Sequence, residues 1–291
     1  MNFNLLLIIF FLFTKANSFL KPQIKNMRNT RLYLVLKNNN WNNFKTHVDN
    51  VVLNHPIVNN NRYTKYFSKG TLSEYELKHF IVQFSVFSNL FLKSQLLKVI
   101  NAPTLEESRE GKEILLNELG VIFNNKNKTH NDIVSTTGTI QGGIYKHEAS
   151  HFEWLLNVGK ELNLTYKDLG KEKQATHQTL HFIHKMDELY GSPNDLEAIA
   201  ASYAIENWAA NGFWNELTDG FKNYNKINNK KIPLGFWIYH SKLEQNHADH
   251  TIDELKKVYE EGRILDEKKF VKVCKEMLDA LQIFWEGMIF I

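Results

Sequence analysis

Cysteine and proline are scarce in this sequence: its 291 residues include one cysteine, Cys274, and five prolines. A single thiol excludes an internal disulfide framework and any cysteine-based zinc site, so we expect Cys274 to be a small, partly buried helix residue. Few prolines leave long stretches without the residue that most often interrupts a helix. The net charge of +3 is small, which argues against a nucleic-acid-binding protein.

Acidic residues are missing from the N-terminal segment, and the first one is Asp49. The apolar run Leu5–Phe13 is too short to span a bilayer and is followed by the small residues Ala16 and Ser18. This pattern predicts a signal peptide, although a membrane anchor or a buried N-terminal helix would also contain such a run. The stretch after it, over residues 21–45, is basic, rich in asparagine and free of acidic residues.

Such a stretch behind a signal-peptide core resembles the two-part leader of proteins sent to the apicoplast of apicomplexan parasites. The resemblance implies entry into the secretory pathway and then into a plastid. We therefore expect a signal peptide over residues 1–18, a transit-like leader over 19–43 and one folded domain over 44–291. We expect no membrane attachment after removal of the leader. With 43% hydrophobic residues, the domain can bury a substantial core.

Helical periodicity dominates the domain, and strand signals are weak. Ser73 followed by Glu76 forms a capping box that begins a long apolar helix, and Pro103 lies just beyond its end. The polar, glycine-containing segment 124–143 is predicted to be a loop between helices. We predict a single all-α bundle of about seven helices. The predicted helices span residues 73–100, 105–119, 145–162, 166 or 171 to 190, 194 or 195 to 214 or 221, 234–260 and 266–287.

A polar stripe interrupts the otherwise amphipathic helix predicted over 234–260. His240, Glu244 and His247 are spaced by four and three residues, which places them on one face, and His250 lies at the edge of that face. Burying such groups without partners costs several kcal/mol. The stripe is therefore either a solvated face or half of a metal site, and partners on other helices decide between the two.

Three other predicted helices carry suitable partners. Glu148 and His151 repeat the Glu-x-x-His spacing of Glu244 and His247. Glu206 lies among alanine, isoleucine, tyrosine and tryptophan, where an isolated carboxylate is unusual, so it is either a ligand or paired with a distant residue.

Glu118 lies at the C-terminal end of its helix, where the helix dipole disfavours an unpaired carboxylate; a frayed surface glutamate is the alternative. Two carboxylate helices and two Glu-x-x-His helices form the ligand set of carboxylate-bridged di-iron bundles. Glutamate and histidine without thiolate suit iron or manganese better than structural zinc.

The sequence resembles the heme-oxygenase-like di-iron oxidases and oxygenases, relatives of TenA and PqqC that include the chlamydial CADD protein of para-aminobenzoate synthesis. The resemblance covers roughly residues 55–255. It is carried by the segments HPIVNNNRYTKYFSKGTLSEYELKHFIVQ, NELG, HFEWLLNVGKELNL, YAIENW and FWIYHSKLEQNHADHTIDEL.

This family has an early Glu and His, a middle Glu and a late His-x3-Asp/Glu-x2-His. His240, Glu244 and His247 match the late element, Glu206 the middle Glu and His151 the early His. The early Glu is Glu118 by local context or Glu148 by spacing, and we lean to Glu118. The resemblance implies a heme-oxygenase-like (TenA/PqqC-like) bundle.

It also implies two iron ions per chain, or Mn or mixed Fe/Mn, that activate O2 on a small organic substrate. Tyr203, Trp208, Trp237 and Tyr239 lie within one or two turns of the expected ligands and either line the substrate pocket or pack the core. The protein would then be a metal-dependent oxidoreductase, and this fold often forms homodimers.

Two alternatives remain from the sequence: a non-catalytic heme-oxygenase-like scaffold in the organelle, and ferritin-like oxidation of Fe(II). Two other activities of the family fit less well, because Cys274 lies in no thiaminase motif and no distal glycines accompany His47 or His55 as heme ligands.

Overall fold

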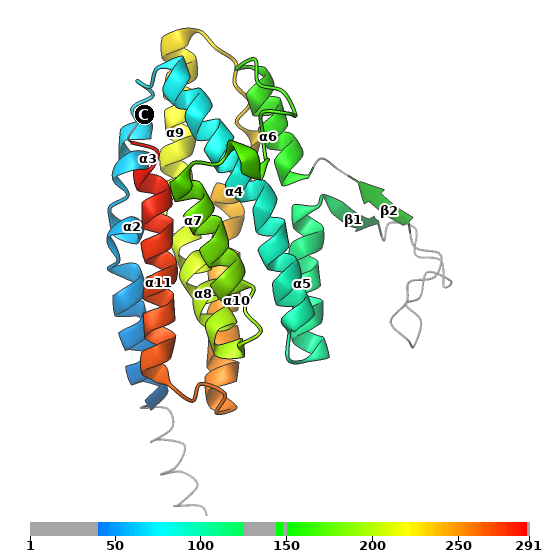
Figure 1. Cartoon of the computed structure of the whole chain (residues 1–291), viewed down its shortest axis with the longest axis vertical. Helices are drawn as coiled ribbons and strands as arrows, with labels where there is room; N and C mark the ends of the chain where they lie inside the picture. Colours follow the sequence, from blue (N-terminus) through cyan, green and yellow to red (C-terminus); the bar gives the residue numbers. More distant parts are fainter. Residues whose placement is uncertain (1–39, 125–143, 148–149, 290–291) are drawn as a thin grey trace, which may run out of the picture.

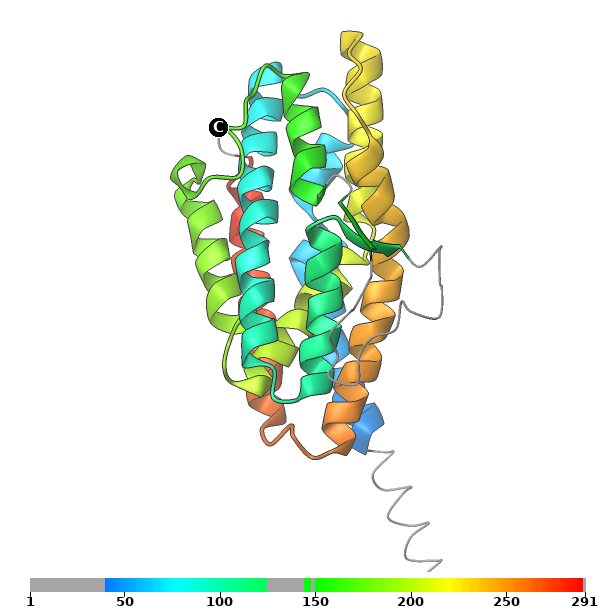
Figure 2. The same ribbon diagram turned by 90° about the vertical axis from the view of Figure 1, so that its right-hand side faces the viewer.

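The computed structural model describes residues 40–124, 144–147 and 150–289; within these ranges, nothing is described of the side chains at 117, 122–124, 144–147 and 243–250. The chain is all-α, with about eleven helices and one two-stranded sheet among the described residues. The longer helices follow the long axis of the molecule (Figure 1 and, turned by 90°, Figure 2). The all-α prediction is confirmed, and the count of seven is too low because several helices are short or broken.

The first described helix covers residues 40–53. It is followed by α2 (Pro56–Asn59), α3 (Arg62–Phe67), α4 (Glu74–Asn101), α5 (Leu105–Glu118), α6 (His151–Lys160) and α7 (His177–Lys185). The chain continues with α8 (Asp195–Ala209), α9 (Phe213–Asn228), α10 (Gly235–Glu260) and α11 (Glu267–Glu286). A 3-10 turn at Glu172–Gln174 precedes α7, and a π-helical turn at Met186–Tyr190 follows it.

Capping boxes set the starts of two helices. The box predicted at Ser73 and Glu76 is confirmed at the beginning of α4. A second box, Ser150 with Glu153, begins α6 at His151. The helix predicted from Tyr145 therefore starts too early, because Ser150 has an extended backbone (φ −63°, ψ 162°) that a continuous helix cannot accommodate.

Two short strands lie on either side of the segment predicted to be a loop. Strand β1 (Val121–Asn124) pairs antiparallel with β2 (Ile144–His147), with Val121 opposite His147 and Asn124 opposite Ile144. The predicted loop, 124–143, lies outside the described residues except for its first position. The sequence signal for strands was weak because each strand is only four residues long.

The helix predicted from Asp195 to Trp214 or Phe221 is two helices, α8 and α9. Gly212, at φ +89°, makes the turn between them, and this left-handed conformation favours glycine. The rings of Trp208 and Phe213 stack across the turn with centroids 4.2 Å apart. The turn directs Trp208 at the end of α8 and Trp214 at the start of α9 toward the same interior space.

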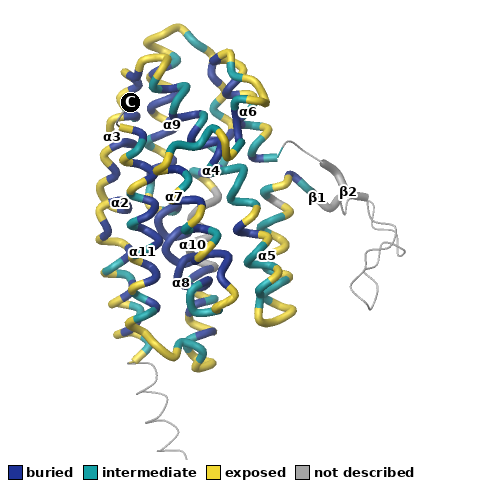
Figure 3. The backbone as a smooth tube through the Cα atoms, in the orientation of Figure 1, coloured by how far each residue is buried: buried dark blue, intermediate teal, exposed yellow. Residues whose placement is uncertain are grey.

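The core is dense in aromatic rings and lies along α4, α8, α10 and α11 (Figure 3). Trp237 is fully buried, with the rings of Phe80, Phe84 and Phe221 at centroid distances of 5.9, 5.3 and 4.7 Å. By length and composition α4 could span a membrane, but 44% of its most apolar window is buried, and it packs against α5, α6 and α7. We read α4 as a core helix of the bundle.

Two further predictions concern the N-terminal leader and the single cysteine. The predicted leader lies mostly outside the described residues, but its last positions, 40–43, belong to the first helix. There the ring of Trp41 packs against that of Tyr259, with their centroids 5.4 Å apart. Cys274 is a helix residue of α11, as predicted, but it is fully rather than partly buried, and its thiol donates to the Ala200 carbonyl at 3.3 Å. Burial raises the pKa of Cys274, so the thiol stays protonated at neutral pH.

Candidate metal centre

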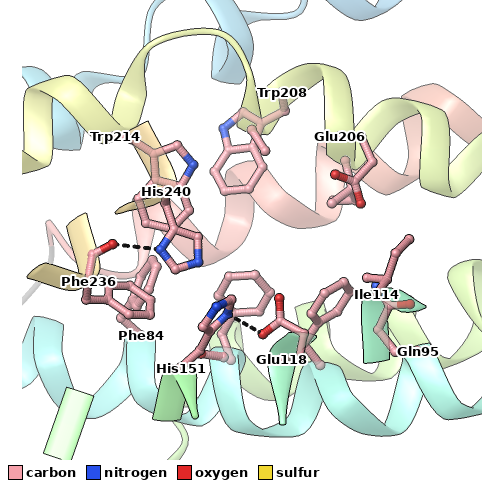
Figure 4. Close-up of a pocket in the computed structure, with 15 residues that line it drawn as sticks. Phe84, Gln95, Ile114, Glu118, His151, Glu206, Trp208, Trp214, Phe236 and His240 are labelled. Atoms are coloured by element: carbon pink, nitrogen blue, oxygen red, sulfur yellow. Dashed lines mark hydrogen bonds and ion pairs between the residues drawn. The ribbon is translucent and has the colours of Figure 1, made fainter. Parts of the chain in front are cut away.

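A buried cavity of about 70 Å³ lies between α4, α5, α6, α8 and α10, and we call it the central cavity (Figure 4). Four of the predicted ligands, Glu118, His151, Glu206 and His240, contribute to its lining. They come from α5, α6, α8 and α10. Segments up to 122 residues apart in sequence therefore deliver imidazole and carboxylate groups to one cavity. The rest of the lining is largely phenylalanine and tryptophan.

His151 owes its position to the start of α6. It is the first residue of the helix after the Ser150 cap, and it is 5% exposed. Its Nδ1 lies 2.7 Å from Oε2 of Glu118, which is the last residue of α5. An ionised carboxylate only accepts, so this bond keeps a proton on Nδ1 and leaves the lone pair of the neutral ring on Nε2.

His240 is held in a comparable way by its own helix. Its Nδ1 donates to the carbonyl oxygen of Phe236 at 2.7 Å, one turn earlier in α10. Because a carbonyl only accepts, the neutral ring again has its lone pair on Nε2. The His240 ring stacks on the ring of Trp214, with their centroids 4.4 Å apart, and its centroid is 4.7 Å from that of His151. Two imidazoles with the same protonation pattern therefore meet inside the cavity.

Glu206 extends into the cavity from α8, on the side opposite His151 and Glu118 in Figure 4. It is 7% exposed. Burial and then the charge of Glu206 raise the pKa of Tyr190 well above its ordinary value. Gln95, which lines the cavity, donates from Nε2 to the Tyr190 hydroxyl at 2.8 Å. The carboxylate of Glu206 thus acts on a buried polar network at this end of the cavity.

The charge of the described lining favours a cation. Glu118 and Glu206 are both present, and none of the described lining residues is lysine or arginine. Among the side chains that the structure describes, however, no three of His, Cys, Asp and Glu lie close enough together to hold one metal ion. Two predicted ligands, Glu244 and His247, lie on α10 one and two turns after His240, with side chains outside the described set, and Glu148 lies outside the described residues altogether.

The four predicted pocket aromatics divide between the cavity and the core. Trp208 lines the central cavity. Trp237 is buried in the aromatic core. The ring of Tyr239 packs against that of Trp154, with their centroids 5.2 Å apart. Tyr203 faces away, donating its hydroxyl to Asp49 at 2.6 Å, and burial raises its pKa.

Sequence reasoning missed several residues that line the cavity. Trp214 and Phe236 hold His240 in place, and Gln95 supplies a polar group from α4. In the part of the chain that the structure describes, Gln95 Oε1, Trp208 Nε1 and Trp214 Nε1 are buried without a hydrogen-bond partner. Phe236 could have been found from its position four residues before His240, whereas Gln95 and Trp214 have no signal in a single sequence.

Comparisons with known proteins come from structure alone, since neither a family model nor a curated protein matches the sequence. A domain of unknown function from Shewanella denitrificans, solved with a heme oxygenase-like fold, matches at a TM-score of 0.56 and 14% identity, over 87% of this chain and 91% of that one. The chain has the heme oxygenase-like fold.

Two further structures extend this heme oxygenase-like group. A TenA homolog from Pseudomonas syringae pv. tomato matches at a TM-score of 0.55 and 12% identity, over 86% of this chain and 90% of that one. A CADD-like protein of unknown function from Nostoc punctiforme matches at a TM-score of 0.52 and 17% identity, over 86% of this chain and 94% of that one. At these identities the matches establish the fold only, and the chemistry of the central cavity has to be argued from its own residues.

Proposed function

We propose that the chain is a non-heme di-iron oxygenase or oxidase that activates O2 on a small organic substrate. The observation that supports this proposal is the convergence of His151, His240, Glu118 and Glu206 on one buried cavity from four helices. Such a donor set suits iron or manganese rather than a thiolate-bound metal. The likeness to TenA and CADD-like proteins supports the fold in which this chemistry would occur.

The residues fit the proposed metal in charge and in orientation. The two carboxylates in the lining, Glu118 and Glu206, carry the charge that suits divalent cations. Both imidazoles have Nδ1 engaged by an acceptor, which is the usual outer-sphere arrangement that turns Nε2 toward a metal. We assign the ligands as Glu118, His151, Glu206, His240, Glu244 and His247, with Glu118 rather than Glu148 as the early carboxylate because Glu118 lines the central cavity.

The bound metals would supply the electrons that reduce O2. The chain itself would do three things. The Phe236 carbonyl and Glu118 would keep the imidazoles in one tautomer, and the surrounding phenylalanine and tryptophan rings would exclude water. The side chains of Gln95, Trp208 and Trp214, which line the cavity, would shape it around a small substrate. A cavity of about 70 Å³ suits a small substrate or the end of a longer one.

Metal analysis tests this proposal. Protein loaded anaerobically with Fe(II) and then desalted should retain about two iron ions per chain. Glu206→Gln should lose at least one of them, because an amide is a poorer metal ligand than a carboxylate, while Glu161→Gln, at an exposed position, should retain both. Retention of less than a tenth of an iron per wild-type chain, in Fe(II) or Mn(II), would contradict the proposal.

The two alternatives predict different results in the same experiment. A scaffold without catalytic activity would retain no iron, and its thermal stability would not change on metal addition. Ferritin-like oxidation would consume O2 with Fe(II) alone and need no organic substrate. An oxygenase or oxidase would instead consume O2 faster when its organic substrate is present, which a screen of small amines, amino acids and fatty acids by O2 electrode would reveal.

A further inference from the structure

Three exposed histidines lie along helix α7, and we call them the α7 histidine stripe. They are His177, His181 and His184, spaced by four and then three residues. At about 100° per residue, this spacing places the three side chains on one face of the helix, one above the other. Phe182 and Ile183 are buried on the opposite side of α7. The helix lies at the edge of the bundle (Figure 2), so the stripe faces solvent.

The imidazoles of the stripe have no partners within the described part of the chain. None of His177, His181 and His184 makes a side-chain hydrogen bond, an ion pair or a ring contact there. Of the four exposed histidines among the described side chains, three belong to the stripe, and the fourth is His47 on the first helix. A neutral imidazole has one nitrogen with a lone pair, and that nitrogen can bind a metal ion. The stripe therefore offers three such nitrogens on one surface.

Histidines four residues apart on a helix can bind the same metal ion. The zinc-binding motif His-Glu-x-x-His uses this spacing to bring two imidazoles to one cation. His177 and His181 have this spacing, and His181 and His184, three residues apart, form a second pair. In the observed conformers no three His, Cys, Asp or Glu side chains of the described set converge on one point. The stripe would thus supply two ligands, and water would fill the other positions.

The charges on α7 do not oppose a bound cation. Lys185 is the one lysine or arginine of this helix. Its Nζ lies 2.9 Å from a carboxylate oxygen of Glu188 and 2.9 Å from one of Glu276. The positive charge of Lys185 is therefore balanced by two carboxylates, and a divalent ion at the stripe meets no unpaired cation of the same helix.

We propose that the α7 histidine stripe binds a divalent late transition-metal ion through His181 and one of its two neighbours, His177 or His184. Imidazole ligands suit Cu(II), Ni(II) and Zn(II), and Cu(II) should bind most tightly. Fe(II) stands lower in the same order of affinity, so desalting should remove it from the stripe. The proposal is independent of iron in the central cavity, where His151 and His240 are buried.

An immobilised-Cu(II) column tests the stripe separately from the central cavity, because a metal fixed to a resin cannot reach buried histidines. Untagged wild-type protein should be retained and eluted by imidazole. His181→Gln breaks both pairs and should elute at a clearly lower imidazole concentration. His47→Gln removes an exposed histidine with no histidine three or four residues away, and it should elute with the wild type.

Two results on the column would overturn the proposal. If His181→Gln elutes with the wild type, the stripe holds no metal. If His181→Gln and His47→Gln elute earlier by the same amount, exposed histidines act singly and no pair chelates the ion. Both substitutions lie at exposed positions, so neither should disturb folding, and circular dichroism checks this.

Cu(II) affinity in solution tests the pairing itself. His181→Gln leaves His177 and His184 about 10 Å apart along the helix axis, which is too far for one ion. The double variant His177→Gln/His184→Gln leaves His181 alone. Both should bind Cu(II) about tenfold or more less tightly than the wild type in competition with a chromophoric chelator, because the second ligand no longer adds to the first.

The single variants His177→Gln and His184→Gln each keep one pair, so each should lose less Cu(II) affinity than His181→Gln. Equal losses in all three single variants would show that the histidines bind independently, and the proposal would fail.

Nuclear magnetic resonance locates the bound ion. Substoichiometric Cu(II) is paramagnetic and should broaden the imidazole C–H signals of His177, His181 and His184 before that of His47. The single variants assign these signals by their disappearance. If the His47 signal broadens at the same Cu(II) concentration as the stripe signals, binding is unspecific and the α7 site does not exist.

Discussion

Trp237 and His240 lie one turn apart on α10, yet their surroundings differ in kind. Both rings contact Trp214 and Phe236. Trp237 otherwise meets the rings of Phe80, Phe84 and Phe221, while His240 meets His151 in a cavity that also contains Glu118 and Glu206. Apolar burial on the Trp237 side of α10 stabilises the fold, whereas the buried titratable groups on the His240 side destabilise it.

This difference shows how one aromatic framework serves two purposes. Rings on the Trp237 side fill space and fix the positions of α4, α9 and α10. The same rings, continued by Trp214 and Phe236, form the walls that hold His240 in one orientation. Because buried titratable groups cost stability, substitutions on the Trp237 side should mainly lower the free energy of unfolding. Substitutions on the His240 side should mainly lower iron binding.

The largest effect on stability is expected at the core residue. Trp237→Ala should lower the free energy of unfolding by about 3–5 kcal/mol, because it leaves a large cavity among rings that cannot collapse onto it. Urea unfolding followed by circular dichroism measures this change. A loss below 1 kcal/mol would mean that the ring cluster is not the stabilising core.

The largest effect on iron binding is expected at His240. His240→Ala should reduce retained iron from about two ions per chain to one or fewer, because it removes a ligand nitrogen. Its effect on unfolding should be smaller than that of Trp237→Ala. His181→Ala, at an exposed position on α7, provides the control and should retain the wild-type iron content. Equal iron content in both variants would remove His240 from the site.

A smaller change is expected at Glu118, which acts both on His151 and in the cavity. Glu118→Gln keeps the shape and can still bond to His151, but it removes a negative charge, so iron affinity should fall about tenfold to a hundredfold. Competition with a chromophoric chelator measures the affinity. Glu113→Gln, exposed on the same helix, should bind iron as the wild type does; if Glu118→Gln also does so, Glu148 becomes the better candidate for the early carboxylate.

The smallest effect is expected far from both regions, at the cap of α4. The backbone N–H of Ser73 is the main cause of a lowered pKa at Glu76, and the Ser73 and Tyr66 hydroxyls add to it. A carboxyl with a lowered folded-state pKa stabilises fully above its unfolded pKa, and this stability is lost as the pH falls through the folded value. Glu76→Gln should therefore cost about 0.5–1 kcal/mol at pH 7 and less below pH ~4. An equal cost at both pH values would rule out this role for the charge.

Four of the predicted ligands are recognisable one helix at a time. Glu-x-x-His spacing pointed to His151, the polar stripe of one helix to His240, a lone glutamate in an apolar stretch to Glu206 and a helix-terminal carboxylate to Glu118. The structure places all four in the lining of one cavity. Their binding of a metal stays a prediction. The polar wall residues could not be predicted, because Gln95 and Trp214 differ from ordinary helix residues only through their neighbours in space.

Local signals also explain which helix boundaries were predicted correctly. Capping boxes, apolar periodicity and the spacing of the His240 stripe are properties of a few consecutive residues, so the sequence alone determined an all-α chain and the start of α4 directly after its cap, Ser73. The turn at Gly212, the pairing of β1 with β2 and the convergence of four helices on the central cavity were decided only by the tertiary structure. The physical reason is that each depends on contacts between segments distant in sequence, whose free energy appears only when the aromatic core closes around them.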